Sequence, residues 1–374
     1  MPSPDQRRLH PPHYPGSSAS REDGPKKKFP GSQGRNGSNR RGPWLLSNPR
    51  PHLKRIALLT SGGDCPGLNP CIRAVVRTAL AGGIETMGVH RGWRGLIDNE
   101  MERMNARSVA GIVKLGGTVL RSSRCPEFRE PQAREKAASH LLDRGIDGLV
   151  VIGGDGSLNG ASELARQTNL PLIGIPKTID NDVGGTDYAL GFDTAVNTAV
   201  EAIDKIRDTA TSHERLFLVE VMGRNRGFLS LQVALACGAE GVLVPEVPTD
   251  ITALCAQLER CREAGKVSSI VVVAEGDDAG NAYEIARKIS DQSGYEPRVS
   301  VLGYIQRGGA PSAADRVQGG LFGKAAVDAL LSGESSKLVA SRNGQVTLVE
   351  LELAWKETRE LPANLLELAR ILAS

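Results

Sequence analysis

The sequence predicts an α/β protein built on mainly parallel sheets, and three observations indicate this fold. Short apolar, β-branched runs alternate with longer segments whose apolar residues have helical spacing. The 374 residues include 43 glycines and only 4% aromatic residues, which suits many tight strand-to-helix turns. The expected strands are continuous apolar runs, as in parallel sheets covered on both faces. A chain of this length has room for two domains.

The expected elements alternate along the chain between strand and helix. The first expected helix has Asn69 as its N-cap and Pro70 as its first residue, and it ends before Gly82. Ligands in such folds bind at the carboxyl ends of the strands, so the segments after each strand are where a site is expected. The expected strands are residues 55–60, 84–89, 147–152, 171–175, 216–222, 241–244, 268–274 and 298–304, and further helices are expected at 131–144, 192–208 and 252–264.

Residues 1–53 differ from the rest in composition. They hold ten basic and three acidic residues and are rich in Pro, Gly, Ser and Asn, so they cannot bury a core and are expected to be disordered. A nucleic-acid or membrane-surface arm and an organelle address are possible functions of this tail. A solvated extension, or a start codon placed too far upstream, is the simpler interpretation. The basic charge therefore predicts neither a nucleic-acid nor a membrane partner.

Two further features bear on the cellular compartment. No apolar run approaches the roughly 20 residues of a membrane span, so a soluble protein is expected. The six cysteines form no C-x-x-C pair and no metal-ligand spacing, which favours reduced thiols in a cytoplasmic enzyme.

Two similar glycine-rich segments follow expected strands. "LLTSGGDCPG" covers residues 58–67 and "VVIGGDGS" covers 150–157, and each runs from a strand through Gly-Gly-Asp into a helix. Glycine loses more conformational entropy on folding than other residues, so its repeated use there indicates that the backbone must be free of side chains. A helix N-terminus presents N–H groups and a positive dipole end, which suits phosphate. Asp155 would repel phosphate unless Mg²⁺ lies between them, while a tight turn with a capping Asp is the structural alternative.

A cluster of acids follows the expected strand 171–175, in "PKTIDNDVGGTDYALGFDTA" over residues 176–195. Asp180 and Asp182 are two apart, so in an extended segment both carboxylates point the same way. One acid can take a proton from an attacking hydroxyl while the other orients it or helps to hold metal, and Thr178 can add a hydroxyl. A cluster of Asx turns is the alternative.

Several arginines lie beside glycine or small residues, some of them at expected strand ends. The planar guanidinium suits bidentate phosphate recognition and stabilises charge on a transferring phosphoryl group, although each arginine alone could be a surface residue. The arginines concerned are Arg124, Arg215, Arg224, Arg298 and Arg307.

At these motifs the sequence resembles the phosphofructokinase family. "LLTSGGDCPGLNPCIRAVVR", "GGDGS", "PKTIDND", "GTDYALGFDTA", "VMGRNRG" and "GYIQRGG" occur in the family's order and approximate spacing, over about residues 54–340. The resemblance implies two Rossmann-like, doubly wound domains with mainly parallel sheets and an active site in the cleft between them. It implies a phosphoryl-donor domain over residues 54–190, completed by 306–374, and a sugar-phosphate domain over 191–305.

The resemblance also implies a reaction. Asp180 would be the base that takes the proton from the 1-hydroxyl of fructose 6-phosphate, supported by Asp182 and Thr178, and Asp155 would bind Mg²⁺. Arg124, bridging the transferring group, and Arg224 complete the expected catalytic set. The expected donor-binding residues are Gly62, Trp93, Arg124, Cys125, Gly154, Asp155, Gly156, Ser157 and Lys177, with Trp93 placed against the adenine. The expected sugar-phosphate residues are Thr178, Asp180, Arg215, Met222, Gly223, Arg224, Glu275, Arg298, Tyr304 and Arg307.

Arg215 and Arg298 are expected to reach the site from a neighbouring subunit, which implies a dimer or tetramer. Many bacterial ATP-using members have His where this chain has Tyr304, and a phenol can still donate a hydrogen bond. The resemblance further implies an effector site between subunits, for a nucleoside diphosphate or phosphoenolpyruvate. Its expected residues are Arg73, Arg77, Arg207, Glu240 and Lys266, although Arg73 and Arg77 could equally be surface charges of one helix face.

The phosphoryl donor has two candidates. The glycine at position 156 resembles the residue found in family members that use ATP, because a carboxylate there would collide with and repel the α-phosphate of ATP. The lysine at position 177 resembles the residue found in family members that use pyrophosphate, where a lysine pairs with this smaller phosphoryl donor. Because Gly156 removes the block while Lys177 does not exclude ATP, the prediction is ATP, with pyrophosphate as the alternative.

Three more distant functions are weaker. A kinase of the NAD or lipid type shares the GGDG turn but has no reason to carry the MGR and GYIQRGG segments. An inactive regulatory subunit would be expected to have lost an acid, whereas Asp155, Asp180 and Asp182 are all present. Nucleic-acid binding would depend on the N-terminal tail alone.

Overall fold

The computed structural model describes residues 53–373, and the larger of its two sheets has seven strands. Their order is β11-β10-β5-β4-β1-β2-β3, and only the two edge pairs, β2–β3 and β10–β11, are antiparallel. The strands are β1 (Arg55–Thr60), β2 (Glu85–Val89), β3 (Met101–Met104), β4 (Gly148–Gly153), β5 (Leu172–Pro176), β10 (Lys337–Arg342) and β11 (Gln345–Glu350).

The smaller sheet has four strands in the order β7-β8-β6-β9, and all of its pairings are parallel. They are β6 (Leu216–Val221), β7 (Gly241–Leu243), β8 (Ser269–Ala274) and β9 (Arg298–Val301). The two sheets confirm the predicted α/β class with mainly parallel strands. All eight expected strands are present, while β3, β10 and β11 were not predicted.

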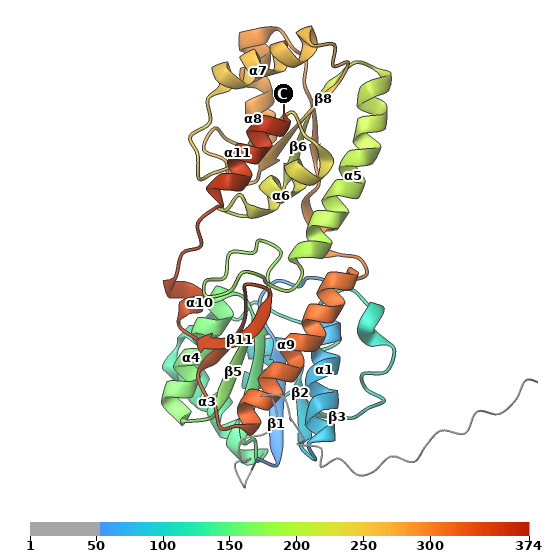
Figure 1. Cartoon of the computed structure of the whole chain (residues 1–374). Coiled ribbons are helices and arrows are strands. Elements are labelled where there is room, and N and C mark those ends of the chain that lie inside the picture. Colours follow the sequence, from blue (N-terminus) through green and yellow to red (C-terminus); the bar gives the residue numbers. More distant parts are fainter. Residues whose placement is uncertain (1–52, 374) are drawn as a thin grey trace, which may run out of the picture. The chain divides into compact units, whose positions relative to one another are not determined.

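Helices cover both faces of the larger sheet. Alternate residues of β1 enter different apolar clusters: Ile56 and Leu58 pack with α1 and α9, and Ala57 and Leu59 pack with α3 and α4 (Figure 1). The helices are α1 (Leu68–Ala81), α2 (Gly92–Ile97), α3 (Pro131–Asp143), α4 (Asp155–Thr168), α5 (Phe192–Ser212), α6 (Phe228–Cys237), α7 (Ile251–Glu263), α8 (Ala282–Ser293), α9 (Ala313–Leu331), α10 (Leu353–Lys356) and α11 (Ala363–Leu372), with 3₁₀ turns η1 (Ile112–Lys114), η2 (Pro126–Arg129) and η3 (Gly303–Arg307).

The start of α1 differs from the prediction. The helix begins at Leu68, and its N-cap is Gly67 in the left-handed conformation, with φ 95°. Asn69 is a fully buried helical residue. Its side-chain amide donates to the carbonyls of Leu115 and Gly116, and its oxygen accepts from the Val119 N–H. Asn69 therefore holds the 115–119 loop rather than capping the helix.

The chain's last helix also lies differently from the expected division. Residues 306–374 were assigned to the region of the larger sheet, but α11 packs against α6 and β7 of the smaller one (Figure 1). The division into two domains stays a prediction. The tail predicted for residues 1–53 lies, apart from Leu53, outside the described residues. The six cysteines are free thiols, and no helix within residues 53–373 has the length and apolarity to cross a membrane.

Candidate active site

The two glycine-rich turns lie next to each other because β1 and β4 are adjacent parallel strands. Their register places Thr60 beside Ile152, and the Ser61 N–H donates to the Ile152 carbonyl at 2.9 Å. The Ser157 and Ser61 hydroxyls are 2.9 Å apart, which joins the second turn to the first. The sequence motif thus becomes one continuous surface of backbone at the carboxyl ends of two strands.

The second turn leaves space where a phosphate chain would enter. Gly154 is extended, and the exposed residues Asp155 and Gly156 begin α4, a helix of 14 residues. A Cβ added at Gly156 would meet nothing within 4 Å. This open helix N-terminus, with its unpaired N–H groups, has the chemistry of an anion site.

The acidic loop after β5 is buried, in contrast to the turns. Asp180 is only 4% exposed, and its Oδ1 has no hydrogen-bond partner among the described residues. Burial, together with the negative charge of Asp182, raises the pKa of Asp180 to about 6, although Arg224, Arg307 and the Thr178 hydroxyl oppose the shift. Asp180 is therefore a carboxylate held ready to accept a proton near neutral pH.

The acidic loop and the second turn are electrostatically linked. Burial raises the pKa of Asp182, and the charge of Asp155 in the glycine turn raises it further. The backbone N–H of Asp180 donates to the Thr178 hydroxyl oxygen at 3.1 Å, which fixes the start of the loop. Three predicted residues, Asp155, Asp180 and Asp182, thus belong to one acidic cluster.

Two cations connect this cluster to the first turn. Lys177 is 4% exposed, and its Nζ donates to the Gly63 carbonyl at 2.5 Å. Burial lowers the pKa of Lys177. A Cβ at Gly63 would lie 2.1 Å from Nη1 of Arg307, so the absence of a side chain at Gly63 lets the guanidinium lie against this turn. The Arg307 Nε is buried without a hydrogen-bond partner among residues 53–373, as expected of a side chain that awaits an anion.

The expected sugar residues follow the carboxyl ends of the smaller sheet's strands. The Arg224 N–H donates to Glu275 Oε2 at 3.3 Å, which joins the loops after β6 and β8. Tyr304 lies in η3, after β9, and is 81% exposed. Sequence reasoning missed Gln306, which is fully buried and accepts the Met222 N–H at 3.0 Å. Its only signal was its place inside the GYIQRGG segment.

Arg215 and Arg298 lie at the amino ends of that sheet's strands, opposite to the carboxyl ends. Arg215 directly precedes β6, and Arg298 begins β9, where it pairs with Phe217 at the start of β6. The six residues of β6 correspond to about 20 Å of extended chain. These two arginines therefore do not meet Asp180 within one chain.

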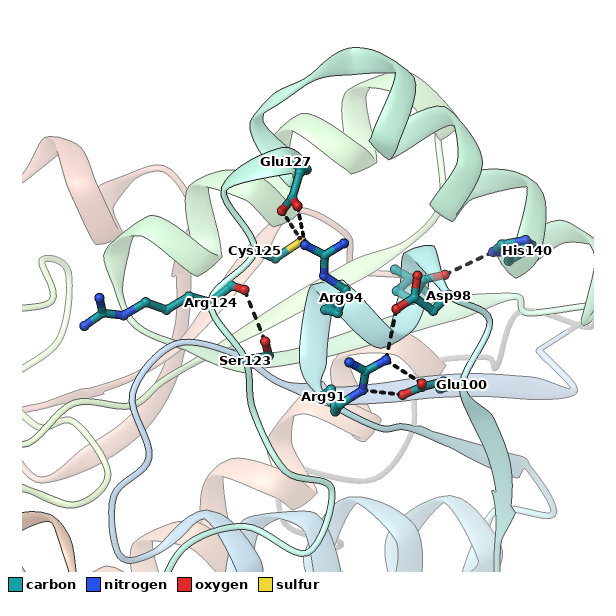
Figure 2. Close-up of polar contacts among 10 residues, drawn as sticks. Arg91, Arg94, Asp98, Glu100, Ser123, Arg124, Cys125, Glu127 and His140 are labelled. Atoms are coloured by element: carbon teal, nitrogen blue, oxygen red, sulfur yellow. Dashed lines mark hydrogen bonds and ion pairs between the residues drawn. The ribbon is translucent and has the colours of Figure 1, made fainter.

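Near α2, the arginines Arg91, Arg94 and Arg124 have different settings. Arg91 pairs with Asp98 at 2.9 Å and with Glu100, and Arg94 pairs with Glu127. Figure 2 shows the Arg124 side chain pointing away from these pairs, and it has no polar partner among the described residues. The Arg124 guanidinium is thus exposed and, within residues 53–373, unpaired.

Two other predicted donor residues are less exposed. The Cys125 thiol is half-buried, 3.6 Å from Glu127 Oε2, and burial raises its pKa. Trp93 is 5% exposed, and its ring stacks on Phe128 with centroids 4.1 Å apart. Trp93 is therefore part of the apolar core in this structure, and its place against an adenine stays a prediction.

The expected effector residues separate into two groups. The buried Glu240 lies 3.5 Å from Arg207 and 3.7 Å from Lys266, and these three form one cluster beside the smaller sheet. Arg73 and Arg77 lie on α1, which packs against α9 of the larger sheet. No hydrogen bond or ion pair within residues 53–373 joins the two groups.

Backbone turns suited to phosphate, a buried base and converging arginines at the carboxyl ends of parallel strands define a phosphate-handling α/β protein. The family model described as Phosphofructokinase matches residues 55–330. The chain therefore belongs to the phosphofructokinase family.

Individual relatives agree. The ATP-dependent 6-phosphofructokinase 1 of Thermus thermophilus is 50% identical over 321 residues, which span 86% of this chain and 100% of the relative. The ATP-dependent 6-phosphofructokinase of Thermotoga neapolitana is 47% identical over the same shares. The solved phosphofructokinase of Saccharomyces cerevisiae superposes with a TM-score of 0.75 and 35% identity, over 80% of this chain and 45% of the yeast chain.

Proposed function

We propose that this protein is an ATP-dependent 6-phosphofructokinase, a phosphotransferase of glycolysis that converts fructose 6-phosphate and ATP to fructose 1,6-bisphosphate and ADP. The observation that carries the proposal is the Asp180 carboxylate, buried, with a free Oδ1 and a pKa raised to about 6, beside two phosphate-suited turns. The curated relatives of the same name support it.

The chemistry begins with proton removal. Asp180 takes the proton of the sugar 1-hydroxyl as that oxygen attacks the terminal phosphorus of ATP, and the bond from this phosphorus to the β-phosphate oxygen breaks. A carboxylate with a pKa near 6 is ionised at neutral pH, yet it is a stronger base than an ordinary Asp. Asp182 and Thr178 support it, because Asp182 raises its pKa and Thr178 holds its backbone.

The cations stabilise the phosphoryl charge. Arg124, exposed and unpaired, bridges the transferring group, and Arg224 stabilises it from the sugar side. Lys177 holds the first turn through Gly63, and Gly62, Gly154 and Ser157 complete the cradle for the donor phosphates. On the sugar side, Met222, Gly223 and Glu275 hold the ring, and Tyr304 and Arg307 bind the 6-phosphate.

The residues present fit Mg²⁺ bound together with the donor. Within residues 53–373 no group of three or more His, Cys, Asp or Glu could hold a metal alone. Mg²⁺ does not need such a group, since it is usually bound by one or two carboxylates plus phosphates and waters. Asp155, exposed at the turn, would hold it, and the ion would neutralise negative charge on the transferred group.

The open space at Gly156 favours ATP, whose α-phosphate it would admit. Pyrophosphate is the second candidate because of Lys177, which is buried beside the first turn. Steady-state rates with each donor, at saturating fructose 6-phosphate and Mg²⁺, test the proposal. We expect turnover with ATP at least about tenfold above that with pyrophosphate, whereas turnover with pyrophosphate alone would overturn the choice of donor.

The remaining assignments complete the proposal. Arg215 and Arg298 lie at the amino ends of β6 and β9, about one strand length or 20 Å from the carboxyl ends that carry the site. In this proposal they therefore complete the sugar-phosphate site of a second subunit. The working form is then a dimer or tetramer. The donor and sugar-phosphate domains meet at this site. The cluster of Glu240, Arg207 and Lys266 is the anchored part of an effector site. We place the enzyme in the cytoplasm.

A further inference from the structure

A C-terminal segment, residues 337–359, packs directly on the acidic loop, although it lies beyond the residues that match the family model. The Gly184 N–H donates to the Ala354 carbonyl at 3.2 Å. A Cβ at Gly184 would lie 2.3 Å from the carbonyl oxygens of Leu353 and Glu357, so the two backbones are in close contact. Support for the catalytic acids thus comes from a part of the chain that no expected motif covers.

Arg359 contacts the residue between the two catalytic acids. Its Nη1 donates to the Asn181 carbonyl at 2.5 Å. Asn181 has a left-handed backbone, with φ 52°, a conformation that asparagine adopts more readily than most other non-glycine residues. Its side chain also holds the loop, since Oδ1 accepts the Ala189 N–H at 2.9 Å. The left-handed turn between Asp180 and Asp182 is therefore held through both the backbone and the side chain of Asn181.

The same guanidinium lies over the ring of Phe228, 4.6 Å from its centroid. Phe228 begins α6 and directly follows the loop of Met222 to Gly227, which carries the proposed sugar residues. Arg359 therefore touches both the acidic loop and the end of the sugar loop.

The charge of Arg359 is suited to this place. Burial lowers its pKa, and the carboxylates of Asp187, Asp182 and Glu357 oppose that shift. A partly buried guanidinium among three acids and above an aromatic face stays charged and is held by several partners at once.

We propose that Arg359 is a positioning residue for phosphoryl transfer, which holds Asn181, and with it Asp180 and Asp182, in register with the sugar loop through Phe228. This inference rests on the proposed function. It explains how the acidic loop can keep one conformation without help from a bound substrate.

The test uses the full-length enzyme. Arg359→Ala should lower kcat with ATP about 10- to 100-fold while the KM for fructose 6-phosphate changes less than about threefold, because the base is displaced and the sugar contacts remain. Amide hydrogen exchange in residues 179–190 should become faster. Arg370→Ala, which removes an exposed arginine of α11, is the matched control and should change neither quantity.

A second variant tests whether Arg359 connects the acidic loop to the sugar loop through the Phe228 ring or only fills space beside it. Phe228→Leu keeps apolar volume but removes the π face, and we expect a smaller loss of kcat of about threefold to tenfold. The double variant should be no slower than Arg359→Ala alone, since both changes break one connection. Additive losses would overturn the bridge, and unchanged kcat and exchange in a folded Arg359→Ala enzyme would overturn the positioning role.

Two further outcomes are distinguishable. If Arg359→Ala does not fold, Arg359→Lys retains the charge without the planar fork and should show the same loss of kcat at unchanged KM, and full activity of this variant would contradict the inference. If the unaltered enzyme does not transfer phosphate to fructose 6-phosphate, the proposed function fails. The exchange measurement on residues 179–190 then still decides whether Arg359 holds the loop.

Discussion

The glycine turns and the acidic loop lie beside each other at the carboxyl ends of the central strands β1, β4 and β5, but they differ in their exposure to solvent. In the turns, Gly62, Asp155 and Gly156 are exposed, and the second turn has open space in place of side chains. In the loop, Asp180 is almost fully buried and its pKa is raised. A large charged donor needs access and bare backbone, whereas a base of tuned strength needs to be removed from water.

Replacing the acid of the buried region is expected to have the largest effect. Asp180→Asn keeps the size of the side chain but removes the proton acceptor, so kcat should fall by about 10³-fold, within the range of general-base contributions. The KM for ATP should change little because the turns are intact. Steady-state kinetics measure both quantities.

The control for this change is Asp208→Asn, which alters an exposed carboxylate on α5 and should leave kcat unchanged. An Asp180→Asn enzyme with near-normal turnover would show that the buried region is not where the proton is taken.

Filling the open turn should have the next largest effect, and it should depend on the donor. Gly156→Asp places a carboxylate where a Cβ meets no atoms within 4 Å, so the fold should be unaffected. Like charges about 4 Å apart near a surface repel by about 4 kcal/mol, which salt reduces, so kcat/KM for ATP should fall about 10²-fold.

Pyrophosphate lacks an α-phosphate and a nucleoside, so its kcat/KM should fall far less in the same variant. Gly156→Ala is the matched control because it adds a methyl group without charge. Equal losses with both donors would contradict the assignment of this space to ATP.

The pH dependence of kcat should report the buried region. Asp180 works only when ionised, and its pKa is raised from 3.8 to about 6. Turnover should therefore be constant above about pH 7 and fall about tenfold per pH unit below pH 6. A rate profile from pH 5 to 8 measures this limb, and an inflection near the ordinary Asp value would show that the acid is not desolvated in the working enzyme.

The same pKa has a consequence for stability. Since the folded state binds the Asp180 proton more tightly than the unfolded chain, this group makes folding less favourable as pH rises from about 4 to about 6. Asp180→Asn removes that cost and should increase the free energy of unfolding at pH 8 by about 1–3 kcal/mol. Urea unfolding of both proteins measures it, and a destabilised variant would mean that the carboxylate has partners in the fold.

Much of the fold, and the adjacency of the glycine-rich turns in the candidate site, could be predicted from the sequence because both depend on local patterns. Strands β1 and β4 are continuous apolar runs that end in Gly-Gly-Asp, and their adjacency follows from a parallel sheet. The edge strand β3, with only its terminal residues Met101 and Met104 buried, carried little apolar signal. Its place depends on pairing with β2, which no local pattern shows.

The residues that sequence reasoning missed are those whose roles depend on distant contacts. Arg359 meets Asn181 across 178 positions of the chain. Gln306 reaches Met222 across 84 positions. The burial of Trp93 likewise depends on a contact that no local pattern shows, the stacking of its ring on Phe128.

The smallest expected effect compares the two turns with each other. Gly62 has φ +86°, a conformation that disfavours a side chain, while Gly156 begins a helix in open space. Gly62→Ala should therefore lower the free energy of unfolding by about 1–2 kcal/mol. Gly156→Ala should leave it unchanged or raise it by about 0.5 kcal/mol, since alanine favours helix. Urea unfolding of the two variants side by side measures the difference. Equal values would mean that the two glycine-rich turns place the same backbone requirement on these glycines. The structure instead assigns a left-handed turn to Gly62 and open space to Gly156, which directly follows the second Gly-Gly-Asp.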